Sequence, residues 1–253
     1  MAKYLTESNP VEIVAFTKNL TSMAQQVGPQ ITISSILPSL DHIINCGMES
    51  QLALMMQTYP LSKFLIDSGL DEAYEAVLST MLPLLSTMLY SHNNKMRRGS
   101  VEQLIRLVEL LKPADRGDYI LKFILSLAHE EDDAQARGAA LSILHHLAPH
   151  LNAEIVEVFI VPEIKSLSID EVDDIRRNVA SNLMNVCDQV SKDVFVRDIF
   201  PILRRLCEDV SDGVRLSCIA QVPQIATKFP QMFPPDELEA MYLKFIRNSR
   251  LDV

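Results

Sequence analysis

The stretch from Asp198 to Ala226, DIFPILRRLCEDVSDGVRLSCIAQVPQIA, decides the fold. An acidic turn from Glu208 to Asp212 divides it into two apolar segments. In the second segment the apolar residues lie at offsets of 0, 4, 8 and 11, at Val214, Cys218, Val222 and Ile225. That spacing forms one stripe along an α-helix. The stretch therefore predicts two helices joined by a short acidic turn.

The same pattern recurs toward the N-terminus with a period of 39 residues. Equivalent apolar stripes lie at Ile175, Val179, Leu183 and Val186, and at Ala136, Ala140, Leu144 and Leu147. One arginine column accompanies the stripes, and we call it the arginine ladder: Arg98, Arg137, Arg176 and Arg215. A single helix pair cannot bury its apolar face, whereas a stacked pair gains two neighbours. The pattern predicts an all-α solenoid of about six helix pairs.

Prolines and one irregular segment modify this pattern. Pro162 and Pro201, also 39 residues apart, are expected near the start of the first helix, where a missing N–H does little harm. Residues 47–70, which include Pro60 and Gly69, fit the period badly, so we expect an irregular or broken helix there. The expected helices are 9–27, 30–46, 49–58, 61–67, 71–91, 94–111, 114–129, 133–148, 152–168, 173–189, 193–208, 213–228 and 235–250.

We expect residues 1–253 to form a single repeat array, because no linker or low-complexity segment interrupts the pattern. The position 39 residues after Val214 is Val253, one residue before the next arginine of the ladder would fall. We therefore expect the chain to be a fragment of a longer solenoid, truncated in its last repeat. The apolar side chains of the last helix would then lack a cover.

The composition excludes several functional classes. The chain is 48% hydrophobic with only 7 glycines, which favours helices over phosphate-binding loops. Its net charge of -10 repels nucleic acid and anionic lipid, so we expect neither nucleic-acid nor membrane binding. The four cysteines lie in apolar segments without a C-x-x-C pair, as reduced core thiols do. Since no signal-like segment is present either, we expect a cytoplasmic or nuclear protein.

Several features together resemble the HEAT repeat: the proline of the first helix, the acidic turn, and the Val-Arg or Ile-Arg start of the second helix. The segment Leu82 to Leu110, LPLLSTMLYSHNNKMRRGSVEQLIRLVEL, and the segment quoted above are similar to scaffold and regulatory subunits of type-2A family serine/threonine phosphatases. The likeness extends to the regulatory subunits of phosphatase 4 and to the A scaffold of phosphatase 2A. Arg97 departs from the pattern, because an apolar residue usually precedes the ladder arginine.

The resemblance implies a non-catalytic scaffold that binds the catalytic subunit of a type-2A family phosphatase, with phosphatase 4 as the first candidate. In these families the turns between the two helices of successive repeats form the partner-binding ridge. Carried over to this chain, the ridge residues are His92, Asn93, Asn94, Lys95, Glu130, Glu131, Asp132, Asp133, Asp170, Glu171, Asp173, Asp174, Glu208, Asp209 and Asp212. An importin-β-like transport or trafficking adaptor is a second hypothesis.

A repeat-based metalloenzyme is a third hypothesis, and the sequence offers little for it. His146 and His150 have the i, i+4 spacing of metal ligands, but Pro149 favours a helix end between them. The chain has one His-Glu pair, His129-Glu130, whereas the HEAT-like deoxyhypusine hydroxylases build their iron site from several such pairs. Nucleophile-elbow, P-loop and dinucleotide motifs are absent from the sequence. We expect no catalytic residue, no cofactor and no metal.

The acidic turns and the arginine ladder each have two readings. Glu131, Asp170 and Asp209 form one column, and Asp173 and Asp212 form another; their position predicts capping of the second helix. The arginines either pair with the acidic column of their own or the adjoining repeat, or they contact a partner. The remaining turn acids either steer a basic partner or only keep the protein in solution.

Overall fold

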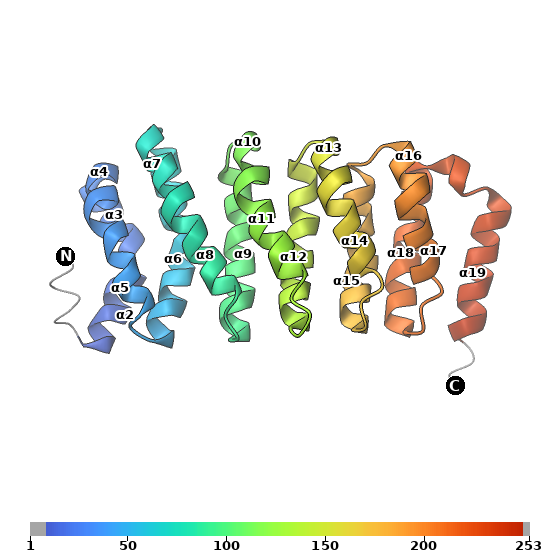
Figure 1. The fold of residues 1–253 in the computed structure, drawn as a ribbon, viewed down its shortest axis with the longest axis horizontal. Coiled ribbons are helices and arrows are strands. Elements are labelled where there is room, and N and C mark those ends of the chain that lie inside the picture. The colour runs from blue at the N-terminus through green and yellow to red at the C-terminus, as the bar shows by residue number, and fades with distance from the viewer. Residues whose placement is uncertain (1–8, 250–253) are drawn as a thin grey trace. The chain divides into compact units, whose positions relative to one another are not determined.

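The computed structural model describes residues 9–249. Val253, where the sequence predicts that the last repeat is truncated, lies outside that range. Every regular element between residues 9 and 249 is a helix, which confirms the all-α fold (Figure 1). The helices group into two compact units, unit 1 up to Phe123 and unit 2 from Ile124 onward. Over this part of the chain, no helix has the length and hydropathy to cross a bilayer.

Unit 1 contains the N-terminal helix pairs. Its α-helices are α2 (Pro10–Lys18), α3 (Leu20–Val27), α4 (Pro29–Ile31), α5 (Leu40–Ile44), α6 (Met48–Asp67), α7 (Asp71–Ala76), α8 (Leu82–Leu89), α9 (Asn94–Leu110) and α10 (Pro113–Asp115). The expected helix over 9–27 is interrupted at Asn19, which caps α2 at its C-terminal end. Inside the unit, α6 packs against α9 on one side and against α2 and α3 on the other.

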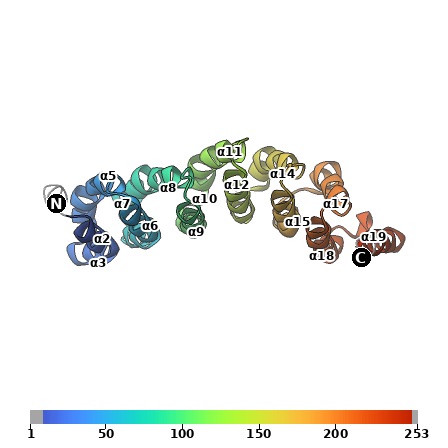
Figure 2. The same cartoon turned by 90° about the horizontal axis from the view of Figure 1, so that it is seen from below.

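Unit 2 contains the most regular repeats. After α11 (Lys122–Ala128), which crosses the boundary between the units, come α12 (Ala134–Leu147), α13 (Ala153–Ile155), α14 (Val161–Leu167), α15 (Asp173–Cys187), α16 (Lys192–Val194), α17 (Phe200–Leu206), α18 (Asp212–Lys228) and α19 (Pro235–Ser249). The second helices stack directly, because α15 contacts both α12 and α18. Within this unit α14 and α17 form one layer and α15 and α18 form the other (Figure 2).

The predicted apolar stripes form the core of unit 2. All residues of the stripes on α12, α15 and α18 are buried, including Val179, Leu183, Val222 and Ile225. The transfer of each such side chain from water contributes about 1.5 to 3 kcal/mol before the cost of ordering the chain. The period of 39 residues therefore places equivalent side chains at equivalent depths in successive repeats.

The first helix of each repeat widens into a π-helical turn just before the proline position. The π segments Val156–Ile160 and Phe195–Ile199 end two residues before Pro162 and Pro201. Pro162 and Pro201 are the second residues of α14 and α17, as expected for prolines near a helix start, and the π segments that follow α13 and α16 lead directly into them. A proline cannot donate to the carbonyl four residues back and its ring collides with that carbonyl, and a wider turn relieves both problems.

The expected break in residues 47–70 does not occur. A single helix, α6, runs from Met48 to Asp67 with Pro60 inside it. Leu54, Leu61 and Leu65 are fully buried on either side of the proline. An interior proline costs a helix about 3 kcal/mol or more, and burial of these side chains against neighbouring helices offsets that cost.

Candidate protein-binding ridge

The arginines of unit 2 tie successive turns to one another. Arg137 donates from Nε and Nη2 to the carboxylate of Asp170 at 2.7 and 3.0 Å, and from Nη1 to the carbonyls of Glu130 and Glu131 at 3.0 and 2.6 Å. The Arg137 guanidinium thus bonds the backbone of its own turn and the carboxylate of the next turn. Of the two hypotheses for the ladder, this geometry supports pairing with acidic residues inside the fold and not contact with a partner protein.

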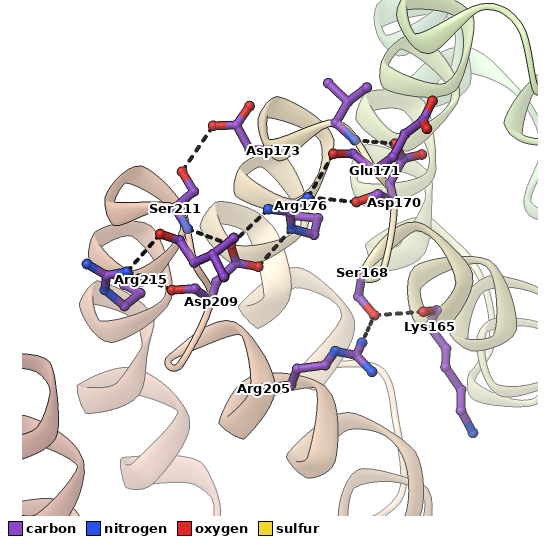
Figure 3. Close-up of polar contacts among 12 residues, drawn as sticks. Lys165, Ser168, Asp170, Glu171, Asp173, Arg176, Arg205, Asp209, Ser211 and Arg215 are labelled. Carbon is purple, nitrogen blue, oxygen red and sulfur yellow. Dashed lines mark hydrogen bonds and ion pairs between the residues drawn. The ribbon is translucent and has the colours of Figure 1, made fainter. Parts of the chain in front are cut away.

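Arg176 shows the same arrangement in the next repeat of unit 2 (Figure 3). It donates to Asp209 at 2.7 and 2.9 Å and to the carbonyls of Asp170 and Glu171 at 2.7 and 3.1 Å. Arg215 bonds the carbonyls of Asp209 and Val210 at 2.7 and 3.1 Å and also pairs with Asp212.

In unit 1 the buried arginine is Arg97 and not Arg98. Arg97 is 3% exposed and donates from Nε to the carbonyl of Leu89 at 3.1 Å, whereas Arg98 is exposed. Arg97 stands four residues after the N-cap Asn93, as Arg137 stands four residues after the N-cap Asp133. The assignment of Arg98 to the ladder is therefore wrong by one residue. Met96, which is buried, is the apolar residue before the ladder arginine Arg97.

The carboxylates of the ladder stay ionised although they are partly buried. Burial opposes ionisation of Asp170, but hydrogen bonds from Arg137 and from the Val172 N–H outweigh it and hold its pKa below the usual value. Asp209 has the same balance, with Arg176 and the Ser211 N–H as donors, and its pKa is lowered too. Asp170 and Asp209 therefore stabilise the fold through these hydrogen bonds.

The predicted columns do not supply the N-caps of the second helices. Asp170 and Asp209 accept from the N–H groups of the N-cap residues Val172 and Ser211, each at 2.9 Å. Asp133 caps α12, accepting from the N–H groups of Gln135 and Ala136 at 3.0 and 2.9 Å. Asp173 and Asp212 are instead the first residues of α15 and α18, whose N-caps Val172 and Ser211 form no side-chain cap. Both still lie where the helix dipole favours a negative charge.

The remaining predicted ridge residues divide into engaged and unengaged side chains. Asn93 caps α9 through the Met96 N–H, Asp173 accepts from Ser211, and Asp174 and Glu208 pair with Arg177 and Lys244. His92, Asn94 and Lys95 are exposed. Among the predicted ridge residues, four exposed acidic side chains make no hydrogen bond or ion pair with the described residues, and we call them the free acids: Glu130, Glu131, Asp132 and Glu171.

Two hollows lie between successive turns of unit 2. The first, of about 430 Å³, is lined by Ala128, His129, Glu131, Arg137, Ser166, Leu167, Asp170 and Glu171; we call it the acidic groove. The second, of about 710 Å³, is lined by Ile169, Asp170, Arg176, Arg204, Arg205, Glu208, Asp209 and Val210; we call it the arginine groove. The two grooves occupy equivalent places in adjoining repeats.

Sequence reasoning missed the exposed apolar residues at the arginine groove. Ile169 is 64% exposed and Val210 is 91% exposed. A signal was available, because the positions 39 residues before them hold Glu130 and Glu171. The exchange of acid for aliphatic side chain between adjoining turns marks them as different surfaces.

The histidine cluster does not converge on a common point. His145 is buried with neither ring nitrogen bonded, and burial lowers its pKa to about 3. His146 is exposed and its Nδ1 contacts the carbonyl of Ser142 at 2.7 Å. Within the part of the chain that the structure describes, no group of three or more His, Cys, Asp or Glu side chains could hold a metal ion.

Known proteins share this sequence pattern at low identity. The chain is 23% identical over 214 residues to human serine/threonine-protein phosphatase 4 regulatory subunit 4. The aligned residues cover 84% of this chain and 24% of that protein. It is 20% identical over 248 residues to rat serine/threonine-protein phosphatase 4 regulatory subunit 1, with 96% of this chain and 26% of that protein covered. The chain thus spans about a quarter of the length of the curated relatives it matches.

A family model and solved structures extend the comparison. Residues 120–241 match the model of the PIK3R4-like middle domain. The crystal structure of Cex1p aligns with a TM-score of 0.53 at 12% identity, covering 92% of this chain and 45% of that one. A designed armadillo repeat protein aligns with a TM-score of 0.52 at 14% identity, covering 88% and 98%. The chain therefore has an all-α helical-repeat fold and resembles, in sequence, the regulatory subunits of phosphatase 4.

Proposed function

We propose that this chain is a non-catalytic scaffold or regulatory subunit that binds the catalytic subunit of a type-2A family protein phosphatase, phosphatase 4 first, and holds it near its substrates. The observation that carries the proposal is the division of labour in the turns of unit 2. The arginine ladder fixes the backbone of these turns, while Glu130, Asp132 and Glu171 project from them without a partner among the described residues.

Rigid turns suit association because a preorganised surface loses little conformational entropy when a partner binds. Exposed charges on such turns contribute little to folding, but they can steer a partner of opposite charge. The similarity to two regulatory subunits of phosphatase 4 supports the choice of partner. We place the complex in the cytoplasm or nucleus.

The test is direct association of purified proteins. The chain is mixed with recombinant phosphatase 4 catalytic subunit and passed over a gel-filtration column, with the phosphatase 2A catalytic subunit in a parallel run. We expect a complex that elutes before either component, with phosphatase activity only in fractions that contain the catalytic subunit. Separate elution with both catalytic subunits would refute the proposal. Hydrolysis of a phosphate ester by the chain alone would refute its non-catalytic part.

A further inference from the structure

The arginine groove has a different chemistry from the acidic ridge that surrounds it. Arg205 lines the groove and donates from Nη2 to Ser168 Oγ, which itself donates to the carbonyl of Lys165 at 2.7 Å (Figure 3). Among residues 9–249, no carboxylate forms an ion pair with Arg205. Asp209 acts on Arg205 electrostatically, but Arg176 already binds that carboxylate. The charge of Arg205 is therefore not neutralised within the fold.

The other charges of the groove are paired. Asp170 is bound by Arg137, Asp209 by Arg176 and Glu208 by Lys244. Arg204 lies 3.6 Å from Glu237 and also approaches the ring of Phe200. Burial lowers the pKa of Arg205, as it does for a cation that has lost water without gaining a counter-ion. A carboxylate from outside the chain would supply that counter-ion.

The acidic groove provides an internal comparison with the same backbone frame. Ser166 occupies the position of Arg205, Glu130 the position of Ile169, and Glu171 the position of Val210. The sequence therefore replaces two exposed acids by aliphatic side chains at the same turn positions where it introduces an arginine. All three exchanges favour an acidic and apolar ligand over a basic one.

We infer that the arginine groove binds a segment of a partner protein in which an Asp or Glu stands beside an aliphatic or aromatic side chain. The carboxylate pairs with Arg205, and the apolar side chain packs between Ile169 and Val210. A residue as exposed as Val210 gains buried apolar area only when a partner covers it. This inference rests on the proposed function in one respect, since both place the partner on the turns of unit 2.

The test uses a library of random twelve-residue peptides displayed on phage and selected on the immobilised full chain. We expect enrichment of peptides with an Asp or Glu next to Leu, Ile, Val or Phe. The affinities of synthetic copies are then measured by fluorescence polarisation. The variant Ile169→Glu/Arg205→Ser/Val210→Glu gives these three positions the side chains that stand 39 residues earlier, and it should weaken binding about tenfold or more, the effect of losing one charge-assisted hydrogen bond.

The control Glu130→Gln/Glu171→Gln alters the other groove and should leave the affinity within about twofold, as exposed charges at a distance do. If the triple variant is less helical than the wild type, the double variant Ile169→Glu/Val210→Glu replaces it, because both side chains are exposed and Arg205 is kept. Enrichment of basic peptides, or equal affinity for wild type and variant, would overturn the inference. Peptide binding without phosphatase binding would refute only the proposed function, and phosphatase binding without acidic peptides would refute only this inference.

Discussion

Arg176 and Asp209 lie 33 residues apart in the sequence, and their side chains meet through two parallel hydrogen bonds of 2.7 and 2.9 Å. The same guanidinium holds two carbonyls of its own turn, at Asp170 and Glu171. One side chain thus fixes the spacing of two successive turns. Because both partners are largely buried, loss of either leaves a charge without compensation.

The first prediction concerns the stability of this pair. Asp209→Asn should lower the free energy of unfolding by about 1.5 to 3 kcal/mol, because Arg176 loses its charged acceptor. The control Asp174→Asn removes an exposed pair with Arg177 and should change it by less than about 1 kcal/mol. Urea unfolding followed by circular dichroism compares the two variants. Equal midpoints for both would mean that the Arg176–Asp209 pair is energetically no different from a surface pair.

The second prediction tests the register of the ladder in unit 1. Arg97→Ala should destabilise the protein by about 1 to 3 kcal/mol, since it leaves a buried carbonyl without its donor. Arg98→Ala replaces an exposed residue and should cost at most about 0.5 kcal/mol. Thermal unfolding of the two variants under the same conditions measures the difference. A larger effect at Arg98 would restore the assignment made from the 39-residue spacing.

The third prediction is a loss of stability on mild acidification. His145 is neutral in the fold, with its pKa lowered from 6.5 to about 3 by burial, so the unfolded chain takes up a proton first as the pH falls. The stability is fully present above pH 6.5 and decreases below it, by about 2 kcal/mol at pH 5. His145→Leu should remove this part of the pH dependence, whereas His146→Gln should not.

The carboxylates of Asp170 and Asp209 contribute to the pH dependence of stability in a separate, more acidic range. The pKa values of Asp170 and Asp209 are lowered in the fold, so their contribution is present above their ordinary value of 3.8 and is lost as the pH falls through the lowered values. A loss of stability between pH 6.5 and pH 5 that persists in His145→Leu would contradict the assignment to His145.

The fourth prediction concerns thiol reactivity. Burial raises the pKa of Cys187 to about 12, and Cys207 and Cys218 are buried with their sulfurs 3.2 Å apart. Cys46 is only partly buried. We expect one fast equivalent with Ellman's reagent in the native protein and none in Cys46→Ser, because a thiol must ionise to react. Fast reaction of Cys46→Ser would show that unit 2 opens readily.

The sequence predicts the helices of unit 2 well because its apolar stripes repeat without error over α12, α15 and α18. The sequence assigns the wrong ladder residue where two adjacent residues both fit the pattern. Arg97 and Arg98 are chemically identical, and the N-cap at Asn93 distinguishes them only once the helix start is known. Likewise Pro60 signals a helix break, but the packing of Leu61 and Leu65 outweighs that local preference.

The candidate site is less visible in the sequence than the fold. Which turn acids are bound depends on neighbours a full repeat away, as for Asp170 with Arg137 and Glu208 with Lys244. That information arises from stacking and not from local spacing. The contrast between Val210 and Glu171 is present in the sequence, but its significance becomes clear only when each residue is seen to line one of two equivalent grooves.

The most direct test of the proposed function is the affinity of the chain for the phosphatase 4 catalytic subunit, measured by biolayer interferometry at two salt concentrations. The variant Glu130→Lys/Asp132→Lys/Glu171→Lys reverses three of the free acids, and Glu102→Lys/Glu154→Lys/Glu239→Lys makes the same change in net charge at exposed positions away from these turns. We predict saturable binding that weakens about tenfold or more in the first variant, mainly through a slower association rate, and that is nearly unchanged in the second. Equal affinity of the wild type and both variants, or no binding by the wild type, would contradict the claim that these turns hold the phosphatase.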